Sequence, residues 1–139
     1  MTYCCGILVR GGLVMIADTR TNAGLDNIAT YRKLHIFESP GDRIVALAAA
    51  GNLAVTQAVL SFLSEGLEDP ETGQVQTIMD MPSMFKTAQF VGDAVRKVRM
   101  IDGPSLELSA SGFDVSILLG GQIGDGRLRL FMIYQAGNF

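Results

Sequence analysis

Four residues in the first part of the chain have side chains that together could support nucleophilic attack on a carbonyl group. Thr2 offers a hydroxyl, while Asp18, Arg20 and Lys33 offer charges. A threonine hydroxyl is a weak nucleophile unless a base lies within hydrogen-bonding reach, and a threonine at a mature N-terminus supplies that base as its own α-amine. The chemistry therefore requires removal of Met1, which a small residue at position 2 usually permits.

The charged residues would set the pKa of that amine. An unperturbed α-amine has a pKa of about 7.7 to 8.0. A positive charge from Lys33 or Arg20 would lower the pKa of the amine and leave it neutral near pH 7, because like charges disfavour its protonated form. Asp18 would hold Lys33 in place and keep it charged.

A predicted β-hairpin would bring these groups together. Two apolar runs, 2–9 and 13–17, are separated by Arg10-Gly11-Gly12, where we expect the glycines to take positive φ in a tight turn. The hairpin would place residues 18–20 beside Thr2. Taken singly, these features have ordinary interpretations: a threonine at position 2 is seldom catalytic, the acidic and basic pair fits a strand-end ion pair, and a lysine is usually solvated.

In combination the motifs resemble a known family. Thr2, Asp18-Thr19-Arg20, Lys33 and Ala49-Ala50-Gly51 resemble the β-subunits of proteasome-type threonine proteases, within the N-terminal nucleophile hydrolases. Residues 18–27, 32–35 and 129–139 look like the bacterial branch of that family called Anbu, the ancestral β-subunit.

The resemblance implies roles for particular residues. Thr2 would be the nucleophile, Asp18 and Lys33 the charge pair that tunes its amine, Arg20 an ordering residue and Gly51 the backbone donor to the oxyanion. Unpaired N–H groups at a helix N-terminus suit that last role. The side-chain pocket would be lined by Thr21, Tyr31, Ala49 and Leu53, and a small residue at position 49 suggests an open, apolar floor.

The remaining chain predicts an α+β domain. After a loop over 21–31 we expect strands at 32–37 and 43–50, a helix that is capped by Asn52 and ends near Gly66, and an exposed connection over 68–73. A second helix should begin near Ser83 and break at Gly103-Pro104, with Phe85 in its apolar stripe and Arg96, Lys97 and Arg99 at its C-terminal end. Strands at 114–119 and 127–134 would follow, joined by a glycine-rich hairpin connection rather than a phosphate-binding loop.

Segregated strands and helices favour a layered α+β architecture. The resemblance sharpens this expectation to a four-layer αββα sandwich, with residues 1–139 in a single domain. Family members are considerably longer, so we expect this chain to cover the first part of the domain and to lack the later serine and aspartate that support the nucleophile.

Composition excludes several other classes. A net charge of −3 and a pI near 5.0 argue against a nucleic-acid partner. There is no apolar run long enough to span a bilayer, and the chain is expected to be cytoplasmic. Cys4 and Cys5 are adjacent in a predicted strand and are poorly placed to bridge each other. The cysteines and the histidine do not have the spacing of metal ligands. The single histidine, His35, fits a structural role better than a catalytic one. We expect no metal and no cofactor.

The sequence therefore favours a threonine peptidase acting on peptides or unfolded proteins. Two alternatives stay open: a scaffold subunit of the same fold with weak or lost activity, and an N-terminal nucleophile amidohydrolase acting on a small amide. The resemblance implies a large homo-oligomer and leaves the question of an ATPase partner open.

Overall fold

The computed structural model describes residues 2–22, 28–108 and 112–139. It opens with an antiparallel hairpin of β1 (Cys4–Val9) and β2 (Gly12–Ala17), in which Val9 pairs with Gly12. The predicted hairpin is confirmed. Its turn differs from the expectation, because neither Gly11 nor Gly12 takes a positive φ. The connection is therefore made without the left-handed backbone that we expected of these glycines.

A second, smaller hairpin replaces the loop expected over 21–31. β3 (Arg20–Asn22) pairs antiparallel with β4 (Ile28–Thr30), and the middle of the predicted loop, 23–27, lies outside the described residues. Strands of three residues are too short to show the alternation of apolar and polar side chains by which a strand is recognised. The loop prediction was wrong for that reason.

The main sheet has the strand order β10-β9-β6-β5, and all of its neighbouring strands are antiparallel. Its members are β5 (Leu34–Ser39), β6 (Arg43–Gly51), β9 (Val115–Ile123) and β10 (Arg129–Ile133). The central strand β6 carries fully buried Val45 and Leu47, as its apolar sequence predicted. β9 runs four residues beyond the expected end at 119, and the glycine-rich stretch is part of a hairpin, as predicted.

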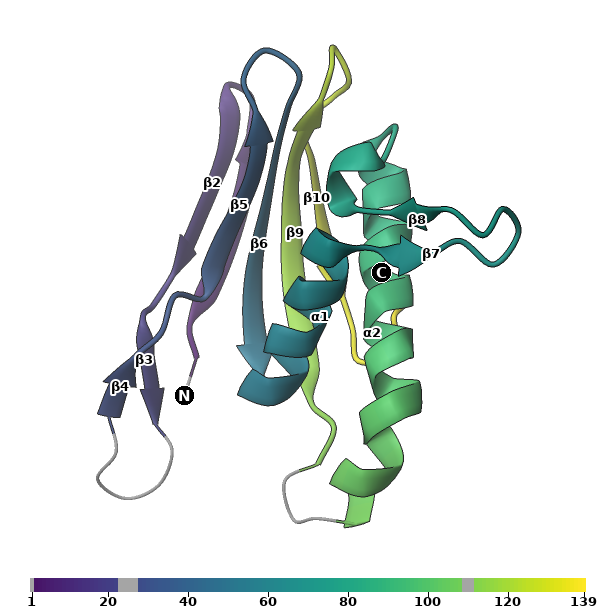
Figure 1. The fold of residues 1–139 in the computed structure, drawn as a ribbon. Helices are drawn as coiled ribbons and strands as arrows, with labels where there is room; N and C mark the ends of the chain where they lie inside the picture. The colour runs from purple at the N-terminus through teal and green to yellow at the C-terminus, as the bar shows by residue number, and fades with distance from the viewer. Residues whose placement is uncertain (1, 23–27, 109–111) are drawn as a thin grey trace.

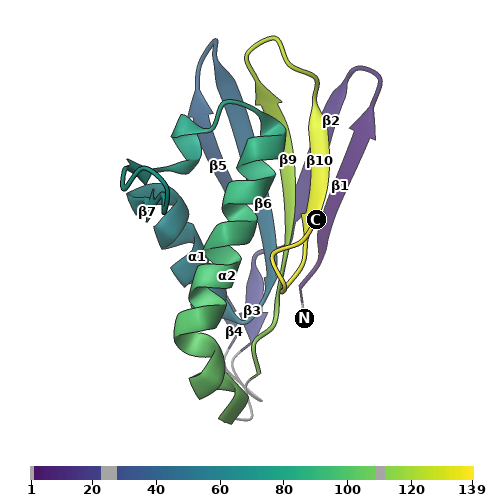
Figure 2. The ribbon, with the colours of Figure 1, turned by 90° about the vertical axis from the view of Figure 1, so that its right-hand side faces the viewer.

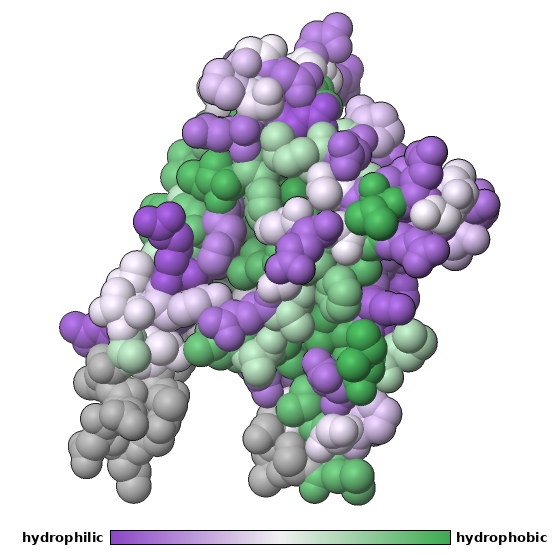
Figure 3. Space-filling view, viewed as in Figure 1, coloured by the Kyte–Doolittle hydropathy of each residue, from purple (hydrophilic) through white to green (hydrophobic). Residues whose placement is uncertain are grey.

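Two helices cover one face of this sheet. Helix α1 (Leu53–Glu65) is capped as predicted, since the Asn52 side chain accepts a hydrogen bond from the backbone N–H of Ala54 at 3.0 Å, and Gly66 ends it. Between the helices lie β7 (Leu67–Glu68), β8 (Val75–Gln76) and a single 3-10 turn, η1 (Ile78–Asp80). The hairpin of β7 and β8 projects away from the helices, where the connection was expected to be exposed (Figure 1), and hydrophilic side chains gather over it (Figure 3).

Helix α2 (Met84–Leu108) differs from the prediction in three respects. It continues through Pro104 instead of breaking there, Phe85 is half-exposed rather than part of the buried stripe, and Arg96, Lys97 and Arg99 lie in the middle of the helix. Proline removes one helical hydrogen bond, in this case the one to the carbonyl of Met100. Pro104 and Met100 are both exposed, so water can reach that carbonyl and the helix persists.

The molecule is thus built in layers, with the β1–β2 sheet on one face of the main sheet and the helices on the other (Figures 1 and 2). Two glycines ease the close approach of the two sheets: a Cβ on Gly120 would lie 2.6 Å from Leu13 Cδ2, and one on Gly6 would lie 2.9 Å from Leu130 Cδ1, so these leucine side chains would have to shift. The α+β class with antiparallel sheets is confirmed. Within the described parts of the chain, no helix has the length and apolar character needed to cross a bilayer.

Candidate active site

The centre of the candidate site is the ion pair between Lys33 and Asp18. Lys33 Nζ lies 2.9 Å from each of the two carboxylate oxygens of Asp18. The lysine is 5% exposed although it is a charged residue. A buried lysine needs such a partner because an unpaired charge is costly to bury.

The strands position this lysine through its backbone. Lys33 immediately precedes β5, and its carbonyl accepts a hydrogen bond from the N–H of Ala49 in β6 at 3.1 Å. Cys4, in β1, lies beside the same strand, with its thiol 3.9 Å from the carbonyl oxygen of Ala49. Burial and the Asp18 carboxylate raise the pKa of this thiol, while Lys33 opposes them. Four separate segments therefore meet at the ion pair.

Asp18 follows β2 and connects the ion pair to the beginning of the chain. Its backbone N–H donates to the carbonyl of Tyr3 at 3.0 Å, and its Oδ1 accepts the N–H of Tyr3 at 2.8 Å. Its other oxygen accepts the N–H of Arg20 at 3.1 Å. The Tyr3 N–H, the Lys33 ammonium and the Arg20 N–H together lower the pKa of this carboxyl to about 2, so it is ionised at neutral pH.

Thr2 immediately precedes Tyr3, the residue whose backbone is hydrogen-bonded to Asp18. It is half-buried, and its neighbour Tyr3 is held on both its N–H and its carbonyl by Asp18. The β1–β2 hairpin thus brings Tyr3, the residue after Thr2, into contact with Asp18. Arg20 takes part through its backbone N–H, which is consistent with an ordering role rather than a chemical one.

Gly51 ends β6, two residues after Ala49, immediately before the capped helix α1. It has a φ of 114°, and a Cβ there would lie only 2.4 Å from the carbonyl oxygen of Asp114. That carbonyl also accepts the N–H of Asn52 at 2.8 Å. The backbone alone therefore requires glycine at this position, whatever part its N–H plays in chemistry.

The four residues expected to line a side-chain pocket lie in different segments of the chain and differ in exposure. Tyr31 donates its N–H to the carbonyl of Thr19 at 2.8 Å, and Thr21 lies in β3 opposite Ala29. Leu53 is 38% exposed at the first turn of α1. Ala49 is 5% exposed and belongs to the hydrophobic core beneath the helices.

Two further residues beside Tyr31 were not assigned to the site from sequence. Gln57 of α1 hydrogen-bonds the Tyr31 hydroxyl, which opposes the rise in pKa that burial gives this phenol. The His35 ring lies 6.3 Å from the Tyr31 ring, and its buried Nε2 has no hydrogen-bond partner among the described residues. Gln57 follows Leu53 by one helical turn, a spacing visible in the sequence, but only the fold brings Tyr31 to it.

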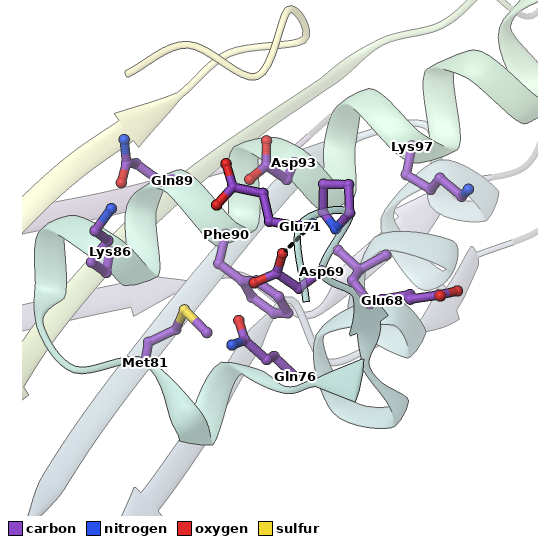
Figure 4. A pocket seen from close by; sticks show the side chains of 12 residues that line it. Glu68, Asp69, Glu71, Gln76, Met81, Lys86, Gln89, Phe90, Asp93 and Lys97 are labelled. Atoms are coloured by element: carbon purple, nitrogen blue, oxygen red, sulfur yellow. Dashed lines mark hydrogen bonds between the residues drawn. The ribbon is translucent and has the colours of Figure 1, made fainter. Parts of the chain in front are cut away.

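Other features lie apart from this site. A hollow of about 520 Å³ is bounded by the β7–β8 hairpin and α2 (Figure 4), and its lining includes none of the candidate site residues Thr2, Asp18, Arg20, Lys33 and Gly51. Both cysteines, Cys4 and Cys5, are free. Over residues 2–22, 28–108 and 112–139, no three His, Cys, Asp or Glu side chains are grouped as metal ligands would be.

Comparison with solved structures identifies the family. Over 99% of its length the chain matches an Anbu (Gly-1) mutant from Hyphomicrobium sp. strain MC1, with 46% identity and a TM-score of 0.83, and covers 54% of that chain. It matches Anbu from Yersinia bercovieri, the ancestral beta-subunit, with 41% identity and a TM-score of 0.80, covering 99% of this chain and 54% of that one. A helical assembly of the Anbu complex from Pseudomonas aeruginosa matches with 35% identity and a TM-score of 0.82, covering 99% and 55%. A scan against protein-family models and a search of curated proteins gave no match.

The layered antiparallel core, the ion pair at the end of its first hairpin and these matches define a proteasome-like N-terminal nucleophile hydrolase. Within that class the chain belongs to the Anbu family. It spans about half the length of the Anbu subunits that it matches.

Proposed function

We propose that the protein hydrolyses peptide bonds, with Thr2 as its nucleophile after removal of Met1. The observation that supports this best is the buried Lys33, which is held by both oxygens of Asp18 while the same carboxylate clamps the residue next to Thr2. A charged lysine kept in a buried position beside a chain terminus has an evident chemical use, since it can keep a nearby α-amine unprotonated.

The proposed reaction has two halves. In the first, the neutral α-amine of Thr2 accepts the hydroxyl proton, Oγ1 bonds to the substrate carbonyl carbon, and the carbonyl electrons move onto its oxygen. The N–H of Gly51 stabilises that oxyanion; losing such a donor costs about 2.7 to 4 kcal/mol in other hydrolases. When the oxyanion collapses, the C–N bond breaks and the leaving amine takes the proton, which leaves an ester on Thr2. In the second half, water activated by the same amine attacks the ester and regenerates the hydroxyl.

The ion pair contributes charge and geometry to this scheme. Asp18 is ionised at neutral pH because its pKa is about 2, so Lys33 always has its counter-ion. Arg20 orients Asp18 through its backbone N–H. Tyr31, Thr21, Ala49 and Leu53 would shape the substrate side-chain pocket, with Gln57 holding the Tyr31 ring in place.

The fold and assembly of the complete subunit are part of the proposal. The outer face of the β1–β2 sheet exposes Ile7, Val9, Val14 and Ile16, each between 46% and 54% exposed. We propose that a second helical layer covers this face in the complete subunit and completes a four-layer αββα sandwich. We further propose a large cytoplasmic homo-oligomer; the relative from Pseudomonas aeruginosa forms a helical assembly.

Intact-protein mass spectrometry of the full-length protein tests this mechanism. The mass is measured before and after incubation with a peptide epoxyketone or β-lactone, reagents that modify N-terminal threonines. We expect loss of Met1 and a single adduct that maps to Thr2. The Thr2→Ala variant should lose the adduct and all peptide hydrolysis, whereas Thr30→Ala, a control at an exposed threonine of β4, should keep both.

The outcomes separate the proposal from its alternatives. Retained Met1, or a free Thr2 that never reacts, would favour the scaffold. Reaction at Thr2 with hydrolysis of small amides but not of peptides would favour the amidohydrolase. Wild-type hydrolysis by the Thr2→Ala variant would disprove the mechanism.

A further inference from the structure

The backbone N–H of Gly51 points towards the segment that carries Lys33. In an antiparallel sheet, successive N–H groups of one strand point alternately towards its two neighbouring strands. The N–H of Ala49 donates to the carbonyl of Lys33, on the β5 side of β6. The N–H of Asn52 donates in the opposite direction, to the carbonyl of Asp114 at the start of β9. Because β6 keeps its register with β9 through Gly51, the N–H of Gly51 has the same direction as that of Ala49.

This direction suits the role proposed for Gly51. The C-terminal end of β6 lies at the same end of the molecule as the N-terminus (Figure 1). A donor to an oxyanion must lie within about 3 Å of it, and a displacement of about 1 Å can cost about a hundredfold in rate. Gly51 cannot hold its own position, because glycine has no side chain to make contacts and has the freest backbone of any residue.

Asn52 connects the chain just after this donor to two other segments. Its backbone N–H donates to the carbonyl of Asp114 at 2.8 Å, and its Nδ2 lies 3.5 Å from the carbonyl oxygen of Gly112. Its Oδ1 accepts the N–H of Ala54, in the first turn of α1, at 3.0 Å. The residue that follows the donor is therefore held from one side by the segment before β9 and from the other side by the helix.

The asparagine side chain is suited to this double contact. Its amide carries both an acceptor, which the helix N–H groups require, and a donor, which reaches the carbonyl of Gly112. Aspartate would keep the acceptor and lose the donor, whereas alanine would lose both.

We propose that Asn52 is a positioning residue for the oxyanion donor, and that it fixes the direction of the Gly51 N–H. This inference rests on the proposed function, in which Gly51 is that donor. Asn52 acts through Gly51 and not on the substrate itself. Both halves of the reaction form an oxyanion at the same carbonyl, so loss of this side chain lowers kcat whichever half is slower. KM changes little, because the carbonyl becomes an oxyanion only during the reaction.

Steady-state peptide hydrolysis by variants of the full-length protein tests this role. Asn52→Ala should lower kcat by about tenfold to a hundredfold and change KM by less than about threefold. Asn52→Ser keeps an acceptor for the helix N–H groups, so its kcat should return to within about threefold of the wild-type value. Each variant is assayed under conditions in which urea unfolding shows that it is folded.

Ser83→Ala is the matched control, because Ser83 caps α2 in the same way as Asn52 caps α1. Its Oγ accepts the N–H of Lys86 at 3.2 Å. Its carbonyl accepts both the N–H and the Oγ1 of Thr87, each at 2.9 Å, and the carbonyl of Asn52 accepts the same two groups of Thr56, each at 3.0 Å. Ser83→Ala should lose stability as Asn52→Ala does and keep the kcat of the wild type.

The outcomes separate positioning from simple stabilisation of a helix. Wild-type kcat in Asn52→Ala, or an equal loss of kcat in Ser83→Ala, would overturn the proposal. A rise in KM alone would also overturn it, since Asn52 would then act on the substrate pocket. A stable Asn52→Ser protein with the low kcat of Asn52→Ala would show that the cap does not position the donor. A wild-type Thr2 that never reacts with the epoxyketone would instead refute the proposed function, and the positioning role with it.

Discussion

Replacing Gly51 with alanine should destabilise the protein through two separable effects. The first is conformational, because a φ of 114° is unfavourable for any residue with a Cβ. The second is steric: the new Cβ would lie 2.4 Å from the carbonyl oxygen of Asp114 and 3.0 Å from the Cα of Val115. Both neighbouring atoms belong to the backbone, so no side-chain rotation can relieve the contact.

The size of the loss follows from these two effects. Unfavourable backbone conformation costs about 1 to 3 kcal/mol, and overpacking costs about 1 to 3 kcal/mol more. Movement of the Asp114 carbonyl would relieve the overlap, but it would weaken the 2.8 Å hydrogen bond from Asn52 N–H to that oxygen. We therefore expect Gly51→Ala to lower the free energy of unfolding by about 2 to 6 kcal/mol.

Urea unfolding of the variant, followed by circular dichroism, measures this loss. Gly41→Ala is the matched control, since Gly41 has a φ of 82° but a Cβ added there would meet no neighbouring atom within 4 Å. The control should show the conformational cost alone, so Gly51→Ala should be less stable than Gly41→Ala by about 1 to 3 kcal/mol. Equal stabilities of the two variants would refute the steric reasoning. A stable Gly51→Ala protein without peptidase activity would instead assign the glycine to catalysis.

Three further predictions concern the ion pair and α2. The pKa of Asp18 is about 2 in the folded protein against an ordinary 3.8, so its ionised form stabilises the folded state above pH 3.8, and this stabilisation is lost as the pH falls towards 2. In the Asp18→Asn variant, the free energy of unfolding should therefore fall less steeply between about pH 4 and about pH 2 than in the wild type. An equally steep fall in both proteins would contradict this prediction. Lys33→Met keeps the apolar stem but removes the charge, so we expect at least a hundredfold loss of peptide hydrolysis with little change in circular dichroism, and retained turnover would exclude a role for the ammonium group. Gly92→Ala should destabilise the protein, because the added Cβ would lie 2.2 Å from the carbonyl oxygen of Gly137. Gly103→Ala is the control: its Cβ would lie 3.3 Å from the Cγ of Arg99, so the variant should be as stable as the wild type or more stable by up to about 1 kcal/mol. Thermal unfolding measures both.

Elements with strong local signals were predictable from sequence. The first hairpin, β6 and α1 agree with expectation, because apolar periodicity and the Asn52 cap are encoded within each segment. The hairpin of β3 and β4 was missed, since its short strands carry no such pattern. The break expected at Pro104 did not occur, because water can hydrogen-bond to the carbonyl of Met100, which would otherwise lack the N–H that proline does not have.

The arginines of α2 show how tertiary contacts change a local interpretation. Arg96 and Arg99 were expected to interact with the end of their own helix. They donate instead to the carbonyl oxygens of Gly137 at 2.9 Å and of Gln135 at 3.4 Å, in the turn after β10. Acceptors so distant in sequence cannot be inferred from helix propensity.

For the candidate site, the sequence by itself determined which chemical groups are present and that a hairpin returns Asp18 to the start of the chain. Both follow from residue type and short-range pairing. Only the tertiary structure decided that Lys33 is buried against both oxygens of Asp18, that Ala49 holds the lysine backbone, and that Gly51 must be glycine. The physical reason is that burial, and contact between backbones far apart in sequence, arise only when β1, β2, β5 and β6 pack together, and no single segment encodes that packing.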